Sequence, residues 1–235
     1  MINGLLTLLA NDITDFLFPR YCIICGCKLT QSEEQICVAC NMSLHRTNFH
    51  TQENNPVEQL FWGRIPIVNA TSFFHYDSEG HRRLLHSIKY FSNPHLGKYL
   101  GKMLAEEIKN SGFFDEIDII VPVPLHWIKR MKRGYNQSAF IAEGIHQATG
   151  IPIVTDAVKR IHNNKTQTLL EQHFQRWENV KDVFKLTKPD KLKGKHILIV
   201  DDVLTTGATT VACAQEIMKA GDVKFTVVSL AFAGH

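Results

Sequence analysis

The chain has 235 residues, of which 44% are apolar and 21% charged, and its formal net charge is +3. These values are typical of a globular protein with one ordinary domain and a smaller unit, and they exclude a disordered chain. The charge is too weak for a global nucleic-acid-binding signature, so any basic surface has to be local.

The first predicted element is an amphipathic helix at residues 3–17, whose apolar side chains fall on one side at helical spacing. Asp12 and Asp15 follow its apolar stretch too soon for a membrane-spanning helix, and no Lys or Arg precedes that stretch. No small-residue cleavage site is evident. We therefore expect no membrane span and no export signal, and hence a cytoplasmic protein whose thiols stay reduced.

Five of the six cysteines lie within residues 22–40. Four of them form two C-x-x-C pairs with eleven residues between the pairs, Cys22 with Cys25 and Cys37 with Cys40. This spacing predicts a structural Zn²⁺ held by four thiolates. Disulfides are the main alternative, which the expected cytoplasmic location disfavours, and a redox site would need only one pair. Cys27 is expected to be a bystander, with the alternative that it replaces Cys25 as a ligand. Cys213 is expected to be a small buried residue of a helix.

From residue 64 onward, apolar runs alternate with helical patterns. Strands are predicted within residues 65–76 and at 117–123, 154–160, 196–200 and 225–232, and helices at 82–90, 96–110, 137–149 and 211–220. Such alternation predicts a mostly parallel sheet flanked by helices, with right-handed crossovers. We expect three parts: a helix and cysteine module at 1–46, a polar linker at 47–63, and an α/β domain at 64–235.

The predicted strand at 117–123 runs into a short loop and then a basic stretch. The loop contains Val123, Pro124 and Leu125, and the basic stretch includes Arg130 and Arg133. A strand end with cations and a helix start beyond it is able to hold an anion through backbone amides and guanidinium groups. The alternative is a solvated basic face.

Residues 197–209 carry the most specific pattern. A continuous apolar strand ends in Asp201 and Asp202, and a hydroxyl-rich loop then opens a helix: Thr205, Thr206, Gly207, Ala208 and Thr209. The loop lacks the Lys of a Walker motif and the glycines of a dinucleotide fingerprint. Two acids suit the hydroxyls of a sugar, and a helix N-terminus suits its phosphate. The alternative is a buried strand that ends in a solvated acidic turn.

This segment resembles the phosphoribosyl-pyrophosphate (PRPP) motif of type I phosphoribosyltransferases, a hydrophobic strand, Asp-Asp and Thr-Gly-x-Thr. The resemblance implies that Mg²⁺–PRPP binds with its 5-phosphate on residues 205–209 and its ribose hydroxyls on Asp201 and Asp202. The pyrophosphate would then lie against the backbone of residues 123–125 and Arg130 or Arg133. Such enzymes also have a mobile loop, expected here at residues 160–184, which would bring Lys165 to the site as a third catalytic residue; an ordinary surface crossover is the alternative.

More of the chain resembles a narrower family, the ComF (ComFC-like) proteins of bacterial DNA uptake. The shared features are Phe18-Pro19 before the first cysteine pair, Ile88-Lys89-Tyr90, Pro122-Val123-Pro124, Arg133-Gly134-Tyr135-Asn136-Gln137, Gln167, and Arg176 with Asn179. The Arg-Gly-Tyr-Asn-Gln run is the most diagnostic of these. The resemblance implies a type I phosphoribosyltransferase-like domain behind a zinc module, and a role in natural competence.

Two hypotheses about function follow. In the first, the protein is an enzyme that transfers phosphoribosyl from Mg²⁺–PRPP to an unknown acceptor. In the second, it is a non-catalytic PRPP sensor or an accessory protein of DNA uptake that binds single-stranded DNA and DNA-uptake proteins. The acceptor would be recognised by a hood drawn from residues 64–95, with His75, His81, His86, Lys89 and His95 as candidates, although histidines scattered in this way are usually surface residues.

Overall fold

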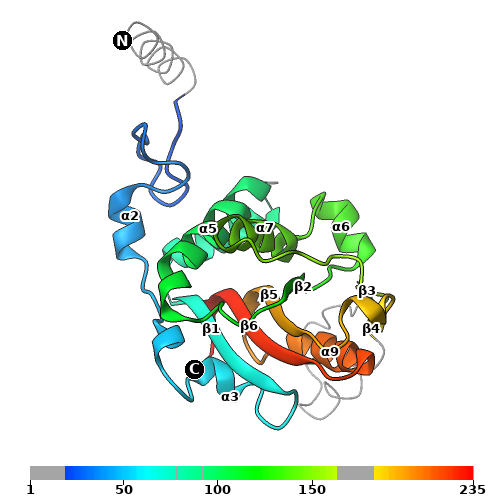
Figure 1. Cartoon of the computed structure of the whole chain (residues 1–235). Helices are drawn as coiled ribbons and strands as arrows, with labels where there is room; N and C mark the ends of the chain where they lie inside the picture. Colours follow the sequence, from blue (N-terminus) through cyan, green and yellow to red (C-terminus); the bar gives the residue numbers. More distant parts are fainter. Residues whose placement is uncertain (1–18, 78, 91–92, 163–182, 235) are drawn as a thin grey trace, which may run out of the picture.

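Four parallel strands form the central sheet of the protein, in the order β1-β6-β5-β2 (Figure 1). The strands are β1 (Ile67–His75), β2 (Ile119–Pro122), β5 (His196–Leu204) and β6 (Lys224–Phe232). The structure is a computed structural model and describes residues 19–77, 79–90, 93–162 and 183–234. Because all four strands run the same way, their carboxyl ends meet at one edge of the sheet, where open α/β sheets bind ligands.

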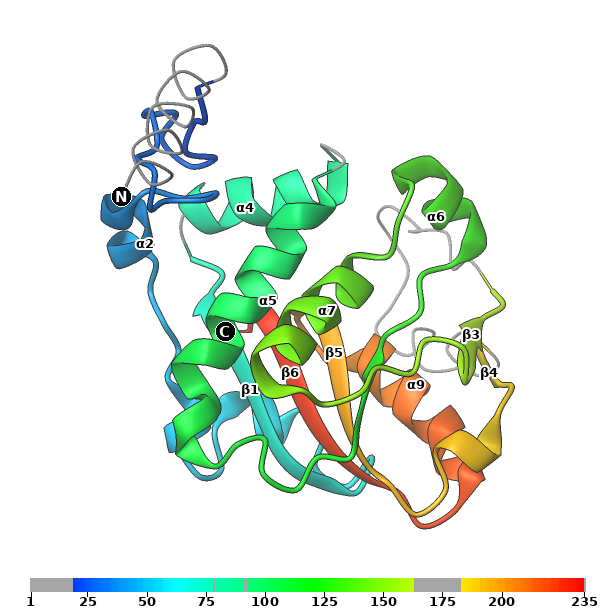
Figure 2. The ribbon, with the colours of Figure 1, turned by 45° about the horizontal axis from the view of Figure 1, so that its top comes forward.

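Helices cover both faces of this sheet (Figure 2). Helices α5 (Pro94–Ile108) and α7 (Gln137–Thr149) lie on one face, and α9 (Ala208–Ile217) and the short α3 (Pro56–Gln59) lie on the other. Neighbouring residues of β5 enter different cores: Leu198 and Val200 pack with α5 and α7, and Ile197 and Ile199 with α9. The predicted parallel sheet flanked by helices is therefore confirmed, as is the burial of Cys213 in α9.

Helices α5 and α7 approach each other closely through two buried glycines. A Cβ on Gly101 would lie 2.2 Å from the carbonyl oxygen of Ile141, and one on Gly144 would lie 2.0 Å from that of Lys98. No side-chain rearrangement relieves such contacts, because both involve backbone atoms. The two glycines therefore set the distance between the helices.

The other elements are shorter. They are α2 (Val38–Ser43), α4 (Glu79–Tyr90), α6 (Trp127–Arg133), the antiparallel pair β3 (Val158–Arg160) and β4 (Phe184–Leu186), and four 3₁₀ turns at Phe49–Thr51, Lys109–Ser111, Pro189–Lys191 and Met218–Ala220. Neither α6 nor β4 was predicted as an element, and the strand predicted at 154–160 is confined to its last three residues. The amphipathic helix predicted at 3–17 lies outside the described residues. Within the described ranges, no helix has the length and apolar character needed to cross a bilayer.

Residues 47–63, predicted as a polar linker, are packed against the sheet. Phe49, Val57 and Phe61 are buried in the core on the α9 side. Asn55 is also buried, and it donates to the carbonyl of Ala70 at 2.9 Å while its Oδ1 accepts from the N–H of Val57, which caps α3. Asn55 thus satisfies backbone groups, although other polar residues of the segment, such as Glu53 and Asn54, are exposed. The division of the chain at residues 46 and 64 stays a prediction.

The cysteine module is joined to the sheet next to this segment. Backbone hydrogen bonds link Thr47 to Phe73 and His45 to His75, so that this stretch runs along the outer edge of β1. Arg46 lies over the Phe73 ring, 4.5 Å from its centroid, and its Nε contacts both carboxylate oxygens of Glu107 at 3.1 Å. The outer edge of β1 is therefore partly covered.

Replacing Gly144 with Ala should destabilise the fold by about 1–3 kcal/mol, because the new methyl group meets the backbone of α5. Urea unfolding followed by circular dichroism measures this change. Gly97→Ala is the matched control on α5, since its Cβ would meet the Phe140 Cβ at an ordinary 3.4 Å. Equal stability of the two variants would contradict the proposed role of Gly144.

Candidate functional site

The first of the two acids is held by hydrogen bonds from three directions. Asp201 Oδ1 accepts from Ser138 Oγ at 3.3 Å and from the N–H of Asp202 at 2.9 Å, and its Oδ2 accepts from Thr210 Oγ1 at 3.2 Å. Ser138 and Thr210 are buried in α7 and α9. The Asp201 carboxylate therefore connects β5 with a helix on each face of the sheet, close to its carboxyl edge.

A loop and a helix N-terminus follow the acids, as predicted. Thr205 and Thr206 are exposed, and Gly207 is the N-cap of α9 with a φ of +67°. A Cβ at this position would lie 3.1 Å from the Phe61 ring, so both the backbone conformation and the space favour glycine. From the other side, Arg64 donates to the Thr206 carbonyl at 3.3 Å. Phe61 and Arg64 support the loop and were not predicted, because their segment had been interpreted as linker and strand start.

The loop after β2 offers fewer backbone donors than the sequence predicted. The N–H of Val123 donates to the carbonyl of Val200 at 2.9 Å, which extends the β2–β5 ladder by one residue. Pro124 has no N–H. Of the three residues predicted to hold a pyrophosphate, only Leu125 therefore keeps a backbone donor for a ligand. Arg130 and Arg133 lie beyond it on α6, the first exposed and the second half-buried.

The Arg-Gly-Tyr-Asn-Gln run joins parts of the site to one another. Tyr135 is buried and its hydroxyl donates to the carbonyl of Ile88 in α4, and Asn136 Nδ2 donates to the carbonyl of Val123 at 3.0 Å. Burial raises the pKa of Tyr135, so its hydroxyl stays a donor. Arg133 donates to Gln137 Oε1 at 3.1 Å. The run thereby links α4, the loop after β2 and the start of α7.

Arg160 at the end of β3 is a further charged neighbour of Asp201. Its guanidinium lies 5.5 Å from the centroid of the Phe184 ring, and the pairing of β3 with β4 places these two residues opposite each other. Burial lowers the pKa of Arg160, and the carboxylate of Asp201 acts in the opposite direction. Arg160 therefore contributes positive charge near Asp201. Lys165 and most of the predicted mobile loop lie outside the described residues.

Of the histidines predicted for the hood, one borders an open cleft at the carboxyl edge of the sheet. His86 lines this cleft of about 750 Å³, together with Ile23 of the cysteine module and Thr205 of the loop after β5. The others lie elsewhere: His81 is buried with its Nδ1 3.1 Å from Asp77, His75 packs against the Phe49 ring, and His95 is exposed near the start of α5. The side chain of Lys89 lies outside the described residues.

The four cysteines predicted to bind zinc come together. Their sulfur atoms all lie within 4.8 Å of one another, and the Cys25 and Cys37 sulfurs are 3.7 Å apart. Four thiolates at about 2.3 Å from a tetrahedral Zn²⁺ stand about 3.8 Å from one another, so the cluster fits this ion. Cys27 is not in the cluster, but it hydrogen-bonds to Cys25 and helps to lower the Cys25 pKa to about 6. The residues present thus favour Cys25 over Cys27 as the ligand.

Comparison with known families agrees with this arrangement. Residues 89–234 match the family described as phosphoribosyl transferase domain. The matched region covers more than half of the chain, and the chain belongs to this family. The predicted type I phosphoribosyltransferase fold behind a four-cysteine module is therefore confirmed.

Among curated proteins, this chain is similar to DNA utilization protein YhgH of Escherichia coli, with 30% identity over 141 residues, and to Competence protein F of Haemophilus influenzae, with 27% over 154 residues. Competence protein ComFC of Bacillus subtilis is 31% identical over 108 residues. These matches cover 59%, 64% and 46% of this chain, and 61%, 67% and 41% of the respective relatives. The chain thus spans about three fifths of the length of the DNA utilization proteins, and the predicted resemblance to ComF proteins is confirmed.

Two solved structures were also similar. Glutamine phosphoribosylpyrophosphate amidotransferase from B. subtilis, complexed with ADP and GMP, has a TM-score of 0.40 and 23% identity, over 61% of this chain and 30% of that protein. Adenine phosphoribosyltransferase has a TM-score of 0.35 and 17% identity, over 61% of this chain and 82% of that protein.

Replacing Cys25 with Ser should remove bound zinc and lower the melting temperature, because a structural zinc site contributes folding energy directly. Cys27→Ser is the matched control and should keep one zinc per chain. Elemental analysis of the purified proteins by mass spectrometry reads both outcomes. Zinc lost from Cys27→Ser and retained by Cys25→Ser would show that Cys27 is the ligand.

Proposed function

We propose that this protein binds Mg²⁺–PRPP at the carboxyl edge of its sheet and transfers the phosphoribosyl group to an acceptor, in the cytoplasmic handling of DNA during natural competence. One observation carries the proposal: Asp201 and Asp202 lie among the last four residues of β5 at that edge, and the loop that opens α9 follows the strand. The names of the relatives, which refer to competence and DNA utilization, support the biological setting.

The helix N-terminus accounts for the binding of the 5-phosphate. The first N–H groups of α9 have no partners within the helix and carry the positive end of its dipole, which suits a phosphate. The backbone and hydroxyls of Thr205, Thr206 and Thr209 add donors around it. Gly207 turns the chain sharply enough for these donors to converge.

The two acids would divide the work of binding the ribose. A carboxylate has about four acceptor positions, and Asp201 uses at least three of them, for Ser138, Thr210 and the N–H of Asp202. We therefore assign Asp201 mainly to positioning, and Asp202 to the ribose hydroxyls. Pyrophosphate would contact the Leu125 amide and the guanidinium of Arg130 or Arg133, with Lys165 arriving from the loop that follows β3.

The reaction is a displacement at C1 of the ribose. A nitrogen of the acceptor forms the new bond to C1, the bond from C1 to the pyrophosphate oxygen breaks with its electron pair on that oxygen, and the acceptor nitrogen then loses a proton. Mg²⁺ would stabilise negative charge on the leaving pyrophosphate. The cations of α6 do the same, and the acids favour the positive charge that develops on the sugar.

Replacing Asp202 with Asn should weaken PRPP binding at least about tenfold, since it removes a charged acceptor for the ribose hydroxyls. Asp201→Asn should weaken binding and also destabilise the fold by about 1–3 kcal/mol, because Ser138 and Thr210 lose their charged acceptor. Calorimetry with PRPP and Mg²⁺, together with thermal unfolding, separates the two effects.

Asp190 provides the control, because it is exposed and lies in the turn that precedes the amino-terminal end of β5. The Asp190→Asn variant should bind PRPP as the wild type does. Unchanged PRPP binding in the double variant Asp201→Asn/Asp202→Asn would contradict the proposed site.

We propose a structural role for the zinc, which would hold the cysteine module in place without touching PRPP.

One surface supports a second function, the binding of single-stranded DNA. Helix α6 exposes Trp127 and Met131, which are 60% and 76% accessible and one turn apart. Lys129 and Arg130 lie on the same helix. An exposed aromatic ring among cations is the arrangement on which bases stack while phosphates are neutralised.

Trp127→Ala should lower affinity for a fluorescent oligo-dT by about tenfold, because stacking of one base contributes about 1–3 kcal/mol. Fluorescence anisotropy at low salt measures this affinity. The slope with which the affinity falls as salt is added gives the number of phosphate contacts. Trp62, which is 50% exposed outside α6, offers the matched control Trp62→Ala. Absence of binding by the wild type at low salt would remove this function.

A further inference from the structure

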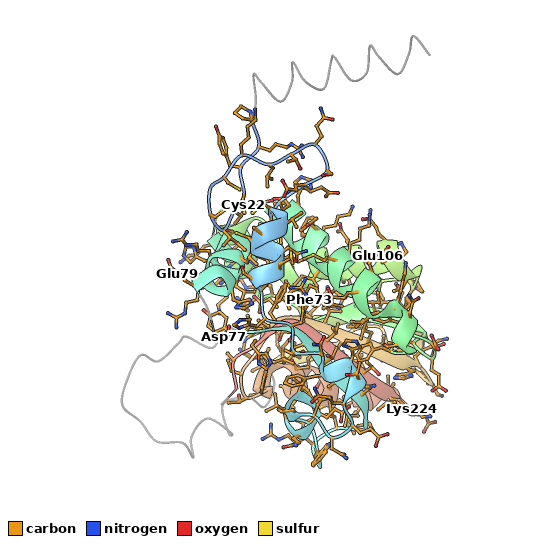
Figure 3. All side chains as sticks on the ribbon, turned by 90° about the vertical axis from the view of Figure 1, so that its left-hand side faces the viewer. Cys22, Phe73, Asp77, Glu79, Glu106 and Lys224 are labelled. Carbon is orange, nitrogen blue, oxygen red and sulfur yellow. The ribbon has the colours of Figure 1, made fainter. Side chains whose placement is uncertain are left out.

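The open cleft at the carboxyl edge of the sheet is built from segments that are far apart in the chain. Tyr76 follows β1, Val203 and Thr205 lie at the end of β5, and Arg82 and His86 come from α4. Ile23 of the cysteine module lines it as well. Figure 3 shows Cys22 and Glu79 toward one end of the molecule and Lys224 at the other, so the cleft lies at the end that carries the module.

The cleft adjoins the proposed PRPP site. Thr205 is both a lining residue of the cleft and the first residue of the loop assigned to the 5-phosphate. A compound in the cleft would therefore lie beside the sugar phosphate, on the side of α4 and the cysteine module. This is a suitable place for the group that attacks C1.

The charges in the cleft favour a ligand with a single negative charge. Glu79 and Arg83 neutralise each other through a contact of 2.7 Å, and Arg83 also donates to the carbonyl of Ile24 at 2.7 Å. Arg82 has no such acid beside it in the described part of the chain, and it is exposed. One guanidinium matches the single charge of a carboxylate, whereas a doubly charged phosphate would exceed the one positive charge that Arg82 supplies.

The remaining walls are mostly apolar. Ile23, Leu85, Val203 and Ala233 border the cleft, and the half-exposed ring of Tyr76 adds a flat surface. An aromatic ring bearing one carboxylate would place its ring against these side chains and its charge near Arg82.

We propose that this cleft is the acceptor site, that it takes an aromatic monocarboxylate carrying the N–H group that attacks C1, and that the cysteine module forms one of its walls. The inference rests on the proposed function, since an acceptor requires PRPP next to it. It also gives the zinc a consequence for specificity. The carbonyl of Ile24, which accepts the hydrogen bond from Arg83 of α4, lies in the chain between Cys22 and Cys25. The metal site therefore fixes the position of this wall relative to α4.

Binding of matched acids and amides tests the charge. Benzoate and nicotinate, compared with benzamide and nicotinamide, are titrated by NMR into the full-length, zinc-loaded protein. The acids should bind at least about tenfold more tightly than the amides, because a charged hydrogen bond is lost in the amide. Arg82→Gln should abolish this difference. Lys224→Gln removes an exposed cation from the opposite edge of the sheet and should retain it.

Two further measurements test the wall and the acceptor role. Ile23→Ala should weaken acid and amide alike by about threefold with zinc content unchanged, because apolar contact with the ring is lost. Val38→Ala, at an exposed apolar position of the same module, is its control. Benzoate should bind alongside Mg²⁺–PRPP rather than compete with it.

Equal affinities for acid and amide in the wild type, or a preference that persists in Arg82→Gln, would overturn the assigned ligand class. Displacement of benzoate by PRPP would overturn the acceptor role. Unchanged affinities of the Ile23→Ala variant for acid and amide would overturn the role of the module as a wall. The titrations of acid and amide are run without PRPP and therefore test the cleft by itself. PRPP binding is measured separately by calorimetry, and its absence would contradict the proposed function alone.

Discussion

The hydrogen bonds to the Asp201 carboxylate hold the site together. They connect the end of β5 with Ser138 at the start of α7 and with Thr210 in the first turn of α9. Hydrogen bonds to a charged acceptor each contribute about 1.5–3 kcal/mol, and these two donors are buried. The Arg-Gly-Tyr-Asn-Gln run directly precedes Ser138, and its own bonds reach α4 and the loop after β2. The motif of the acids and the motif of the basic loop therefore form one structural unit.

The central sheet was predictable because its signal is local. The centre of β5, Ile197–Val200, is a continuous apolar run, and β6 is mostly apolar; both stretches are buried on both faces, as such runs are expected to be. Helix α6 has only seven residues, and a basic run of that length shows no clear periodicity. The segment at 47–63 was misleading for another reason. Its polar residues include Asn55, which is buried because it satisfies backbone groups of α3 and β1.

The candidate site was predictable to the level of motifs and no further. The acids and the loop of residues 205–209 lie at the carboxyl edge of the sheet, where the pattern placed them. That the Val123 N–H is used by the sheet is a matter of strand register, which the motif does not contain. The same holds for Phe61 under Gly207 and for Ile23 in the cleft, since each meets residues from distant parts of the chain.

The covered edge of β1 has a consequence for where this domain begins. The family match starts at residue 89, after β1 and most of α4, yet β1 pairs along the length of β6. A polypeptide starting at that boundary would expose β6 as an edge strand, and every residue of β6 except Lys224 is buried in the intact fold. Such an edge is a template for association with other chains. The unit that folds is thus longer than the stretch that matches the family, and the residues before that stretch keep β6 from becoming an exposed edge.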